Sequence, residues 1–306
     1  MVISDRMLSH ARQYLCALVT AIESEICLIA MEQFGVSNEA IKSLAARENS
    51  RSYELLETTG VLKKQTLLNS VFVNAQKEEL QSRLLQKTSQ EDLENTLTQH
   101  LDDEDNAIAE AAMALLVAHG RKAASLVSLS DLSAETLHAL AWPVVAALEK
   151  LANYTGNGLI MAAENMLGLH DESASVESRA GRLALLLSNP NRTFCLQPHP
   201  LNDGLHLFLA KLARQSGLSV DQITIFTAEP NMARLVIVMR ASELPPEHAL
   251  SIFATLEASG AILTAASYNE IDIETAKGLM AKWRMNLSYL EAETLFSVNT
   301  DGAYLG

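Results

Sequence analysis

Apolar residues near the start of the chain recur with a helical period, and this pattern most constrains the fold. Spacings of three, four and seven residues place side chains on one face of a helix, where they can be buried together. The same spacing returns between residues 62 and 86. Aromatic residues make up only 5% of the chain, which favours helices packed on helices over a β-sandwich. The first such face comprises Leu8, Leu15, Leu18, Val19, Ile22, Ile26 and Ile29.

The stretch from Leu132 to Leu148 carries one charged residue, Glu135, and has Pro143 in its middle. It could be a membrane segment, a kinked core helix or the wall of a ligand site. About a dozen apolar residues between polar ends are too few to span a bilayer. We therefore expect a core helix that either kinks at Pro143 or is followed by a second helix starting there.

The N-terminal apolar stretch is also unsuited to a bilayer. Residues 16–31 contain Glu23 and Glu25 near their centre, and each carboxylate would cost about 2.5–3.5 kcal/mol there. The first residues lack the basic and apolar regions of a secretory signal. Cys16, Cys27 and Cys195 match no CxxC pattern, so we expect reduced thiols in a cytoplasmic protein.

Residues 188–204 form a Pro- and Asn-rich connector. It divides the chain into an N-terminal helical region, 1–187, and a C-terminal helical region, 205–306, unless the two form one continuous array. Two similar segments after the connector, a little under thirty residues apart, suggest a two-helix repeat. The predicted fold class is all-α, with stacked helix pairs in an irregular, HEAT-like array.

Residues 222–240 leave one choice open. The runs ITIFTA and RLVIVM, separated by EPNMA, are rich in Ile, Val and Thr. These residues favour strands, so a small β-hairpin is as compatible with the sequence as two short helices.

Several blocks of the sequence resemble a bacterial family catalogued as domain of unknown function 2336. The resemblance covers roughly residues 10–285 and implies an all-helical protein of stacked helix pairs, which favours helices at Ile223–Met239. It implies no reaction and no functional residue. The similar blocks are AAMALLVAHGRKAA (111–124) and the segments 132–151, 161–187 and 205–249.

A formal net charge of −14 and a pI near 5.0 narrow the possible partners. The electrostatic field of a protein with this negative charge repels a phosphate backbone or an anionic membrane surface, unless a local basic patch outweighs it. Only short basic clusters occur, such as Lys63-Lys64 and Arg121-Lys122. We therefore expect neither nucleic acid nor membrane as a partner.

His170-Asp171 is the best candidate for metal-dependent chemistry. A histidine and an aspartate on an all-helical scaffold can hold a divalent metal that activates water for phosphoester hydrolysis. Further ligands would be His119 or His138 and Asp203 or Asp221. The alternative is that the pair caps a helix end.

His138 and Trp142 lie one helical turn apart and could line a pocket for a small apolar ligand. The acids Asp102, Asp103 and Asp105 do not form a calcium loop, because Ala107 and Met113 stand where that loop needs glycine and glutamate. They are instead a candidate acidic interaction surface.

The leading hypothesis is a non-enzymatic helical scaffold, possibly regulatory, for protein–protein interaction with a partner that has a basic surface. Self-association is compatible with it, and no cofactor is expected. The alternatives are a metal-dependent phosphohydrolase of the His-Asp type and a helical bundle that binds a small ligand.

Overall fold

The computed structural model describes residues 5–46, 50–88, 97–123, 127–188, 197–229, 231–257, 260–285 and 289. Every regular element in these ranges is a helix, which confirms the all-α prediction. The regular stacking of helix pairs stays a prediction. The α-helices are α1 (Asp5–Glu32), α2 (Glu39–Ala45), α3 (Arg51–Thr59), α4 (Gln65–Lys87), α6 (Asn106–Ala123), α7 (Ala134–Ala152), α8 (Gly158–Leu169), α9 (Val176–Leu187), α10 (Pro200–Ser216), α11 (Val220–Thr227), α12 (Ala233–Ala241), α13 (Pro246–Leu256), α14 (Ala265–Glu270) and α15 (Ile273–Trp283), and the 3-10 turns are η1 (Val61–Lys63), η2 (Leu129–Asp131) and η3 (Glu172–Ala174).

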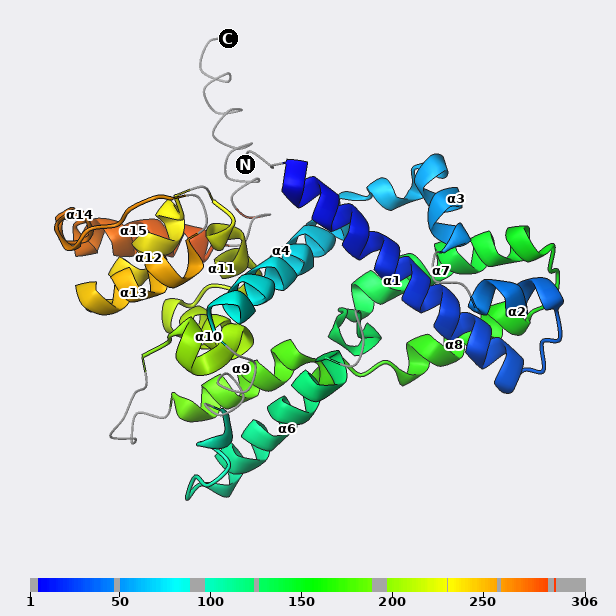
Figure 1. The fold of residues 1–306 in the computed structure, drawn as a ribbon, viewed down its shortest axis with the longest axis horizontal. Coiled ribbons are helices and arrows are strands. Elements are labelled where there is room, and N and C mark those ends of the chain that lie inside the picture. The colour runs from blue at the N-terminus through cyan, green and yellow to red at the C-terminus, as the bar shows by residue number, and fades with distance from the viewer. Residues whose placement is uncertain are drawn as a thin grey trace, which may run out of the picture.

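α1 is the central helix of the first hydrophobic core. It packs against α2, α3, α4, α7 and α8 (Figure 1). Leu18, Val19, Ile22 and Ile26 are completely buried, and burial of each such side chain stabilises the fold by about 1.5–3 kcal/mol. The predicted buried face is therefore confirmed over most of its length, although Leu8 at its start is exposed.

By length and composition, α1 could also cross a membrane. Within Leu8–Glu32, a window of 18 residues has a mean hydropathy of 1.8, and half of this window is buried inside the protein. Glu23 lies within this stretch and accepts hydrogen bonds from Ser50 Oγ and from the backbone N–H of Ser52. Glu23 thus joins α1 to the start of α3.

α4 connects this core to a second one (Figure 1). Its first half, to Ala75, belongs to the first core, and Leu80 and Leu84 belong to a second core built with α10–α15. A third core joins α6, α9 and one face of α10. Gln76 and Lys77 are the buried polar residues between the two apolar parts of α4.

α7 contains the apolar stretch around Pro143 and is one helix from Ala134 to Ala152. Ser133 caps its start, and Asn153 ends it in a left-handed conformation. Its buried residues belong to the first core. The core helix is confirmed, and it continues through Pro143 rather than restarting there.

The possible β-hairpin near 222–240 is wrong, because two helices occupy this range. α11 begins with a capping box: the backbone N–H of Gln222 donates to Ser219 Oγ, and the backbone N–H of Ser219 donates to Gln222 Oε1. Ile223, Phe226 and Val238 are buried in the second core. Tertiary burial of these side chains outweighs their intrinsic preference for strands.

The predicted connector is helical at its end, since α10 begins at Pro200 with His199 as its N-cap. Residues 189–196, which include Cys195, lie outside the described residues. α9 and α10, on either side of the connector, share the third core. The division into two regions stays a prediction.

Cys16 and Cys27 are free thiols on α1. Burial, together with the carboxylate of Glu23, raises the pKa of Cys27 to about 12, so this thiol stays protonated at neutral pH. Cys16 is partly exposed. Cys27 therefore behaves as a core residue, as its helical spacing predicts.

Candidate functional site: a groove between three helices

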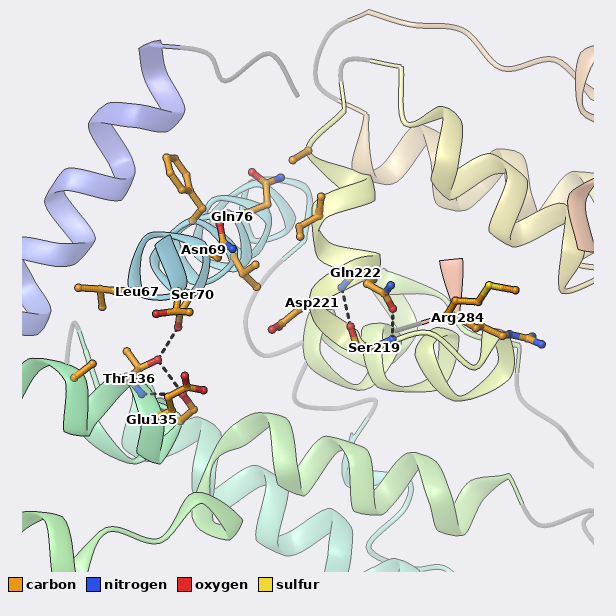
Figure 2. Close-up of a pocket in the computed structure, with 18 residues that line it drawn as sticks. Leu67, Asn69, Ser70, Gln76, Glu135, Thr136, Ser219, Asp221, Gln222 and Arg284 are labelled. Carbon is orange, nitrogen blue, oxygen red and sulfur yellow. Dashed lines mark hydrogen bonds between the residues drawn. The ribbon is translucent and has the colours of Figure 1, made fainter. Parts of the chain in front are cut away.

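A cavity of about 880 Å³ lies where α4, α7 and α11 meet, and we name it the groove (Figure 2). Figure 2 shows side chains from the three helices facing one another across it. Its apolar lining comes from all three helices. These residues are Leu67, Phe72, Val73, Ala139, Ile225 and Ala228.

Hydrogen bonds between side chains hold the walls of the groove together. Thr136 Oγ1 on α7 donates to Ser70 Oγ on α4 over 3.0 Å. Gln76 Nε2 on α4 lies 3.5 Å from Thr227 Oγ1 on α11. Each pair joins residues far apart in the sequence, so the groove forms only in the folded chain.

Arg284 and Met285, which follow α15, line one end of the groove. Arg284 Nε donates to the carbonyl oxygen of Ser216 over 2.7 Å. The guanidinium passes over Gly217, where a Cβ atom would lie 2.9 Å from Nε and where φ is +66°. Glycine is therefore needed at this helix end both for its backbone conformation and for the close approach of Arg284.

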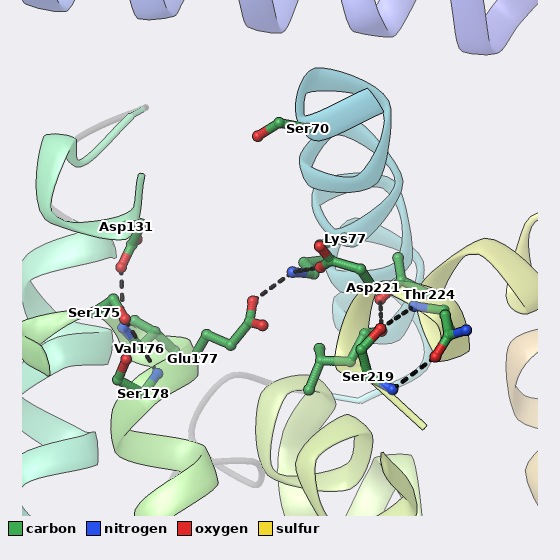
Figure 3. A network of polar contacts seen from close by, with 12 residues as sticks. Ser70, Lys77, Asp131, Ser175, Val176, Glu177, Ser178, Ser219, Asp221 and Thr224 are labelled. Atoms are coloured by element: carbon green, nitrogen blue, oxygen red, sulfur yellow. Dashed lines mark hydrogen bonds and ion pairs between the residues drawn. The ribbon is translucent and has the colours of Figure 1, made fainter. Parts of the chain in front are cut away.

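A second cavity of about 190 Å³ adjoins the groove, and we name it the anionic pocket. The two cavities share Ser70, Val73, Ser133 and Asp221 in their linings. Four carboxylates and one ammonium group line the anionic pocket. They belong to Asp131, Glu172, Glu177, Asp221 and Lys77. Figure 3 shows Glu177 and Asp221 paired with Lys77, and Asp131 across the space from it.

Lys77 joins three helices, since it pairs with Glu177 on α9 and, over 3.0 Å, with Asp221 on α11. Its side chain is 7% exposed, whereas those of Glu177 and Asp221 are 45% and 57% exposed. Burial lowers the pKa of Lys77, but the two carboxylates raise it by more, so the net pKa is above its ordinary value. Lys77 is therefore held in its charged form.

Asp131 and Glu172 lie at helix starts, where the positive end of the helix dipole favours a carboxylate. Asp131 Oδ1 accepts from the backbone N–H of Val176 over 3.0 Å. Its other oxygen, Oδ2, is buried and has no hydrogen-bond partner among the described residues. Glu172 Oε1 accepts from the backbone N–H of Ala134. In the described part of the chain, neither carboxylate forms an ion pair with a cationic side chain.

The predicted metal pair has structural partners of its own. His170 Nε2 donates to the carbonyl oxygen of Leu132 over 3.0 Å. Asp171 Oδ1 accepts from the backbone N–H of Ser173 over 2.9 Å and caps η3. These contacts are the ones expected if the pair caps a helix end, which was the alternative to a metal site.

The structure does not bring the proposed further ligands together around His170 and Asp171. Asp203 pairs with Lys211 over 2.5 Å on α10, and the ring of His119 stacks on that of His206 at 5.4 Å. Across the described ranges, no group of three or more His, Cys, Asp or Glu side chains is placed to hold a metal ion.

His138 and Trp142 contact each other on the outer side of α7. Trp142 Nε1 donates to His138 Nε2 over 3.2 Å, and the rings meet edge to face at 6.1 Å. His138 is exposed. Neither residue lines the groove, although Ala139, between them in sequence, does.

The acids Asp102, Asp103 and Asp105 lie before α6, and Asp102 and Asp105 are exposed. Asp103 Oδ1 accepts from the backbone N–H of Asp105 over 3.0 Å, and Asp105 Oδ1 accepts from that of Ala107 over 2.9 Å. Asp103 and Asp105 therefore help to start α6. None of the three lines the groove or the anionic pocket.

Sequence reasoning missed Lys77 and the groove. A signal was present, because Val73, Lys77, Leu80 and Leu84 follow helical spacing and all four are buried. A lysine in an otherwise apolar stripe needs an acidic partner. Nothing local in the sequence identifies Glu177 and Asp221 as that partner.

Comparisons of the chain with protein-family models, with curated proteins and with solved structures found no match in any of the three. The resemblance to the family catalogued as domain of unknown function 2336 stays a prediction.

Proposed function

We propose that this protein is a helical scaffold that binds a segment of another protein in the groove between α4, α7 and α11. One observation carries the proposal: an apolar lining drawn from three helices lies beside a pocket with an excess of carboxylates. An apolar centre with a polar border is typical of surfaces that bind protein segments.

The charge of the chain supports a partner with basic residues. The formal net charge is −14, and the four carboxylates beside the groove exceed the single ammonium of Lys77. Complementary charge speeds the encounter and selects the partner. The same charge argues against nucleic acid and anionic membranes as partners. The free thiols of Cys16 and Cys27 support a cytoplasmic location.

Selection from a phage-displayed library of random peptides tests the groove. The bait is the purified chain, and Ala139→Trp, which places an indole in the groove, serves for counter-selection. Ala146→Trp is the matched control, because Ala146 is exposed on the same helix and lines neither cavity.

We expect enriched peptides to bind wild type and Ala146→Trp alike and to lose at least about tenfold in affinity for Ala139→Trp, a change of about 1.4 kcal/mol. The proposal is wrong if no peptide is enriched, or if the enriched peptides bind Ala139→Trp as tightly as wild type.

A small-molecule ligand is the second candidate, because about 880 Å³ lies within the range of roughly 300–1,000 Å³ common for ligand pockets. Native mass spectrometry of gently purified protein tests it. A bound compound would appear as additional mass on the protein. If this additional mass is absent from Ala139→Trp but present in Ala146→Trp, the result would favour a small ligand over a protein segment.

A further inference from the structure

We propose that the anionic pocket binds the guanidinium group of an arginine in the partner segment, while apolar side chains next to that arginine occupy the groove. This inference rests on the proposed function and adds the chemistry by which the partner is recognised. It predicts a segment with both apolar residues and arginine.

The charges in the pocket are balanced only in part. Lys77 neutralises charge at Glu177 and Asp221, with which it forms ion pairs. Among the described residues, Asp131 and Glu172 receive only backbone N–H groups, at the starts of α9 and α7. A helix dipole contributes roughly half a unit charge. An added cation therefore meets a net negative field within the pocket.

The acceptors suit a guanidinium better than an ammonium. Each of the four carboxylates uses one oxygen for a contact within the protein, which leaves four second oxygens on different elements. Asp131 Oδ2 is closed to solvent, so the acceptors open to a ligand lie on Glu172, Glu177 and Asp221, and Asp131 contributes its charge. A guanidinium offers five N–H donors in a fixed plane and loses its hydration more readily than an ammonium.

The position of the pocket allows one segment to reach both cavities. In Figure 3, Asp131 on η2 lies across the space from Ser70 and Lys77, which both lie on α4. A volume of about 190 Å³ equals roughly six water molecules in the liquid, at about 30 Å³ each. It can hold a guanidinium and its stem. The shared lining at Ser70, Val73 and Ser133 makes the pocket continuous with the groove.

The test is a titration of the isotope-labelled full chain followed by NMR of its backbone amides. The probes are N-acetyl-arginine N-methylamide and the corresponding citrulline compound, which has nearly the same shape but no charge. We expect the arginine probe to shift the amide signals of Ser133, Val176 and Ser178, and the citrulline probe to leave them unchanged.

Asp131→Asn keeps an acceptor oxygen for Val176 and removes the charge. We expect it to weaken binding of the arginine probe about tenfold, because the negative charge of this carboxylate, which attracts the guanidinium, would then be lost. Asp102→Asn removes the same charge from an exposed site outside both cavities and should leave binding within twofold. If Asp131→Asn does not fold, Glu172→Gln gives the same measurement.

Equal shifts with the two probes, or unchanged binding to both pocket variants, would overturn the arginine site. Peptides that bind through the groove but tolerate replacement of arginine by citrulline would overturn it too, while leaving the proposed function intact. Conversely, an arginine probe that binds as expected, without any groove-dependent peptide, would retain the pocket and refute the proposed function.

Discussion

Replacement of Lys77 by methionine removes the positive charge that α4 places between α9 and α11. Methionine retains an unbranched, flexible side chain of similar length, so much of the packing of the lysine stem is preserved. The variant therefore isolates the contribution of the ion pairs with Glu177 and Asp221. We expect a lower free energy of unfolding.

The pKa of Lys77 gives the direction of this change in the free energy of unfolding. That pKa is raised although burial alone would lower it, so the folded chain holds the proton of Lys77 more tightly than the unfolded chain does. The stabilisation is fully present below the unfolded pKa of about 10.4 and is lost as the pH rises through the folded value.

The magnitude lies between two limits. Removal of one partner from a fully buried pair costs about 3–5 kcal/mol, and exposed pairs contribute about 0–1 kcal/mol. Lys77 is 7% exposed, but its two partners are about half exposed and can turn to water when the ammonium is gone. We therefore expect a loss of roughly 1–2 kcal/mol.

Urea unfolding at pH 7, followed by circular dichroism, measures this loss. Lys42→Met is the matched control, because Lys42 forms an exposed pair with Glu39 within one helix and should change stability by less than about 0.5 kcal/mol. Equal midpoints for Lys77→Met and wild type would refute the reasoning, since the ion pairs would then only offset the cost of burying the ammonium.

Three further predictions concern other parts of the fold. Burial and the nearby His248 lower the pKa of His199, so the unfolded chain takes up this proton more readily. The free energy of unfolding should fall as the pH drops below about 6.5, and urea midpoints from pH 7.5 to 5 should show a weaker fall in His199→Gln. Leu140→Ala should cost about 2–5 kcal/mol, because Leu140 is completely buried on α7, whereas Leu169→Ala at an exposed position should leave the thermal midpoint nearly unchanged. Glu23→Leu should cost about 1–3 kcal/mol, because it leaves the hydrogen bonds at the start of α3 unmade, and amide hydrogen exchange across α3 should become faster than in wild type.

Local features of the sequence predict most of the helices. The spacing of apolar residues predicted the buried face of α1. The apolar stretch from Leu132 to Leu148 predicted the core helix that α7 forms. The β-prone residues after Ser219 left a hairpin possible, although Ser219 and Gln222 already form the pattern of a capping box. The cap was the stronger signal, because it acts at a fixed spacing, whereas the strand preference of Ile and Val depends on where they are buried.

The candidate site could not be predicted in the same way. Glu177 and Asp221 are 100 and 144 residues from Lys77 in sequence, and the groove needs α4, α7 and α11 in place together. Pro143 offers a partial signal. It has no N–H to donate to the carbonyl oxygen of Ala139, and Ala139 lines the groove.

The position of Lys77 along α4 explains why the site lies where it does. Apolar residues on either side of Gln76 and Lys77 belong to different cores, so α4 passes through a polar layer between them. A buried lysine is stable there only if carboxylates from other elements reach it, and those elements cannot then close the space around it with apolar side chains. The same residue that interrupts the apolar stripe therefore leaves room for the anionic pocket. A buried charge in an otherwise apolar helical stripe predicts a junction between cores, while only the folded chain identifies its partners.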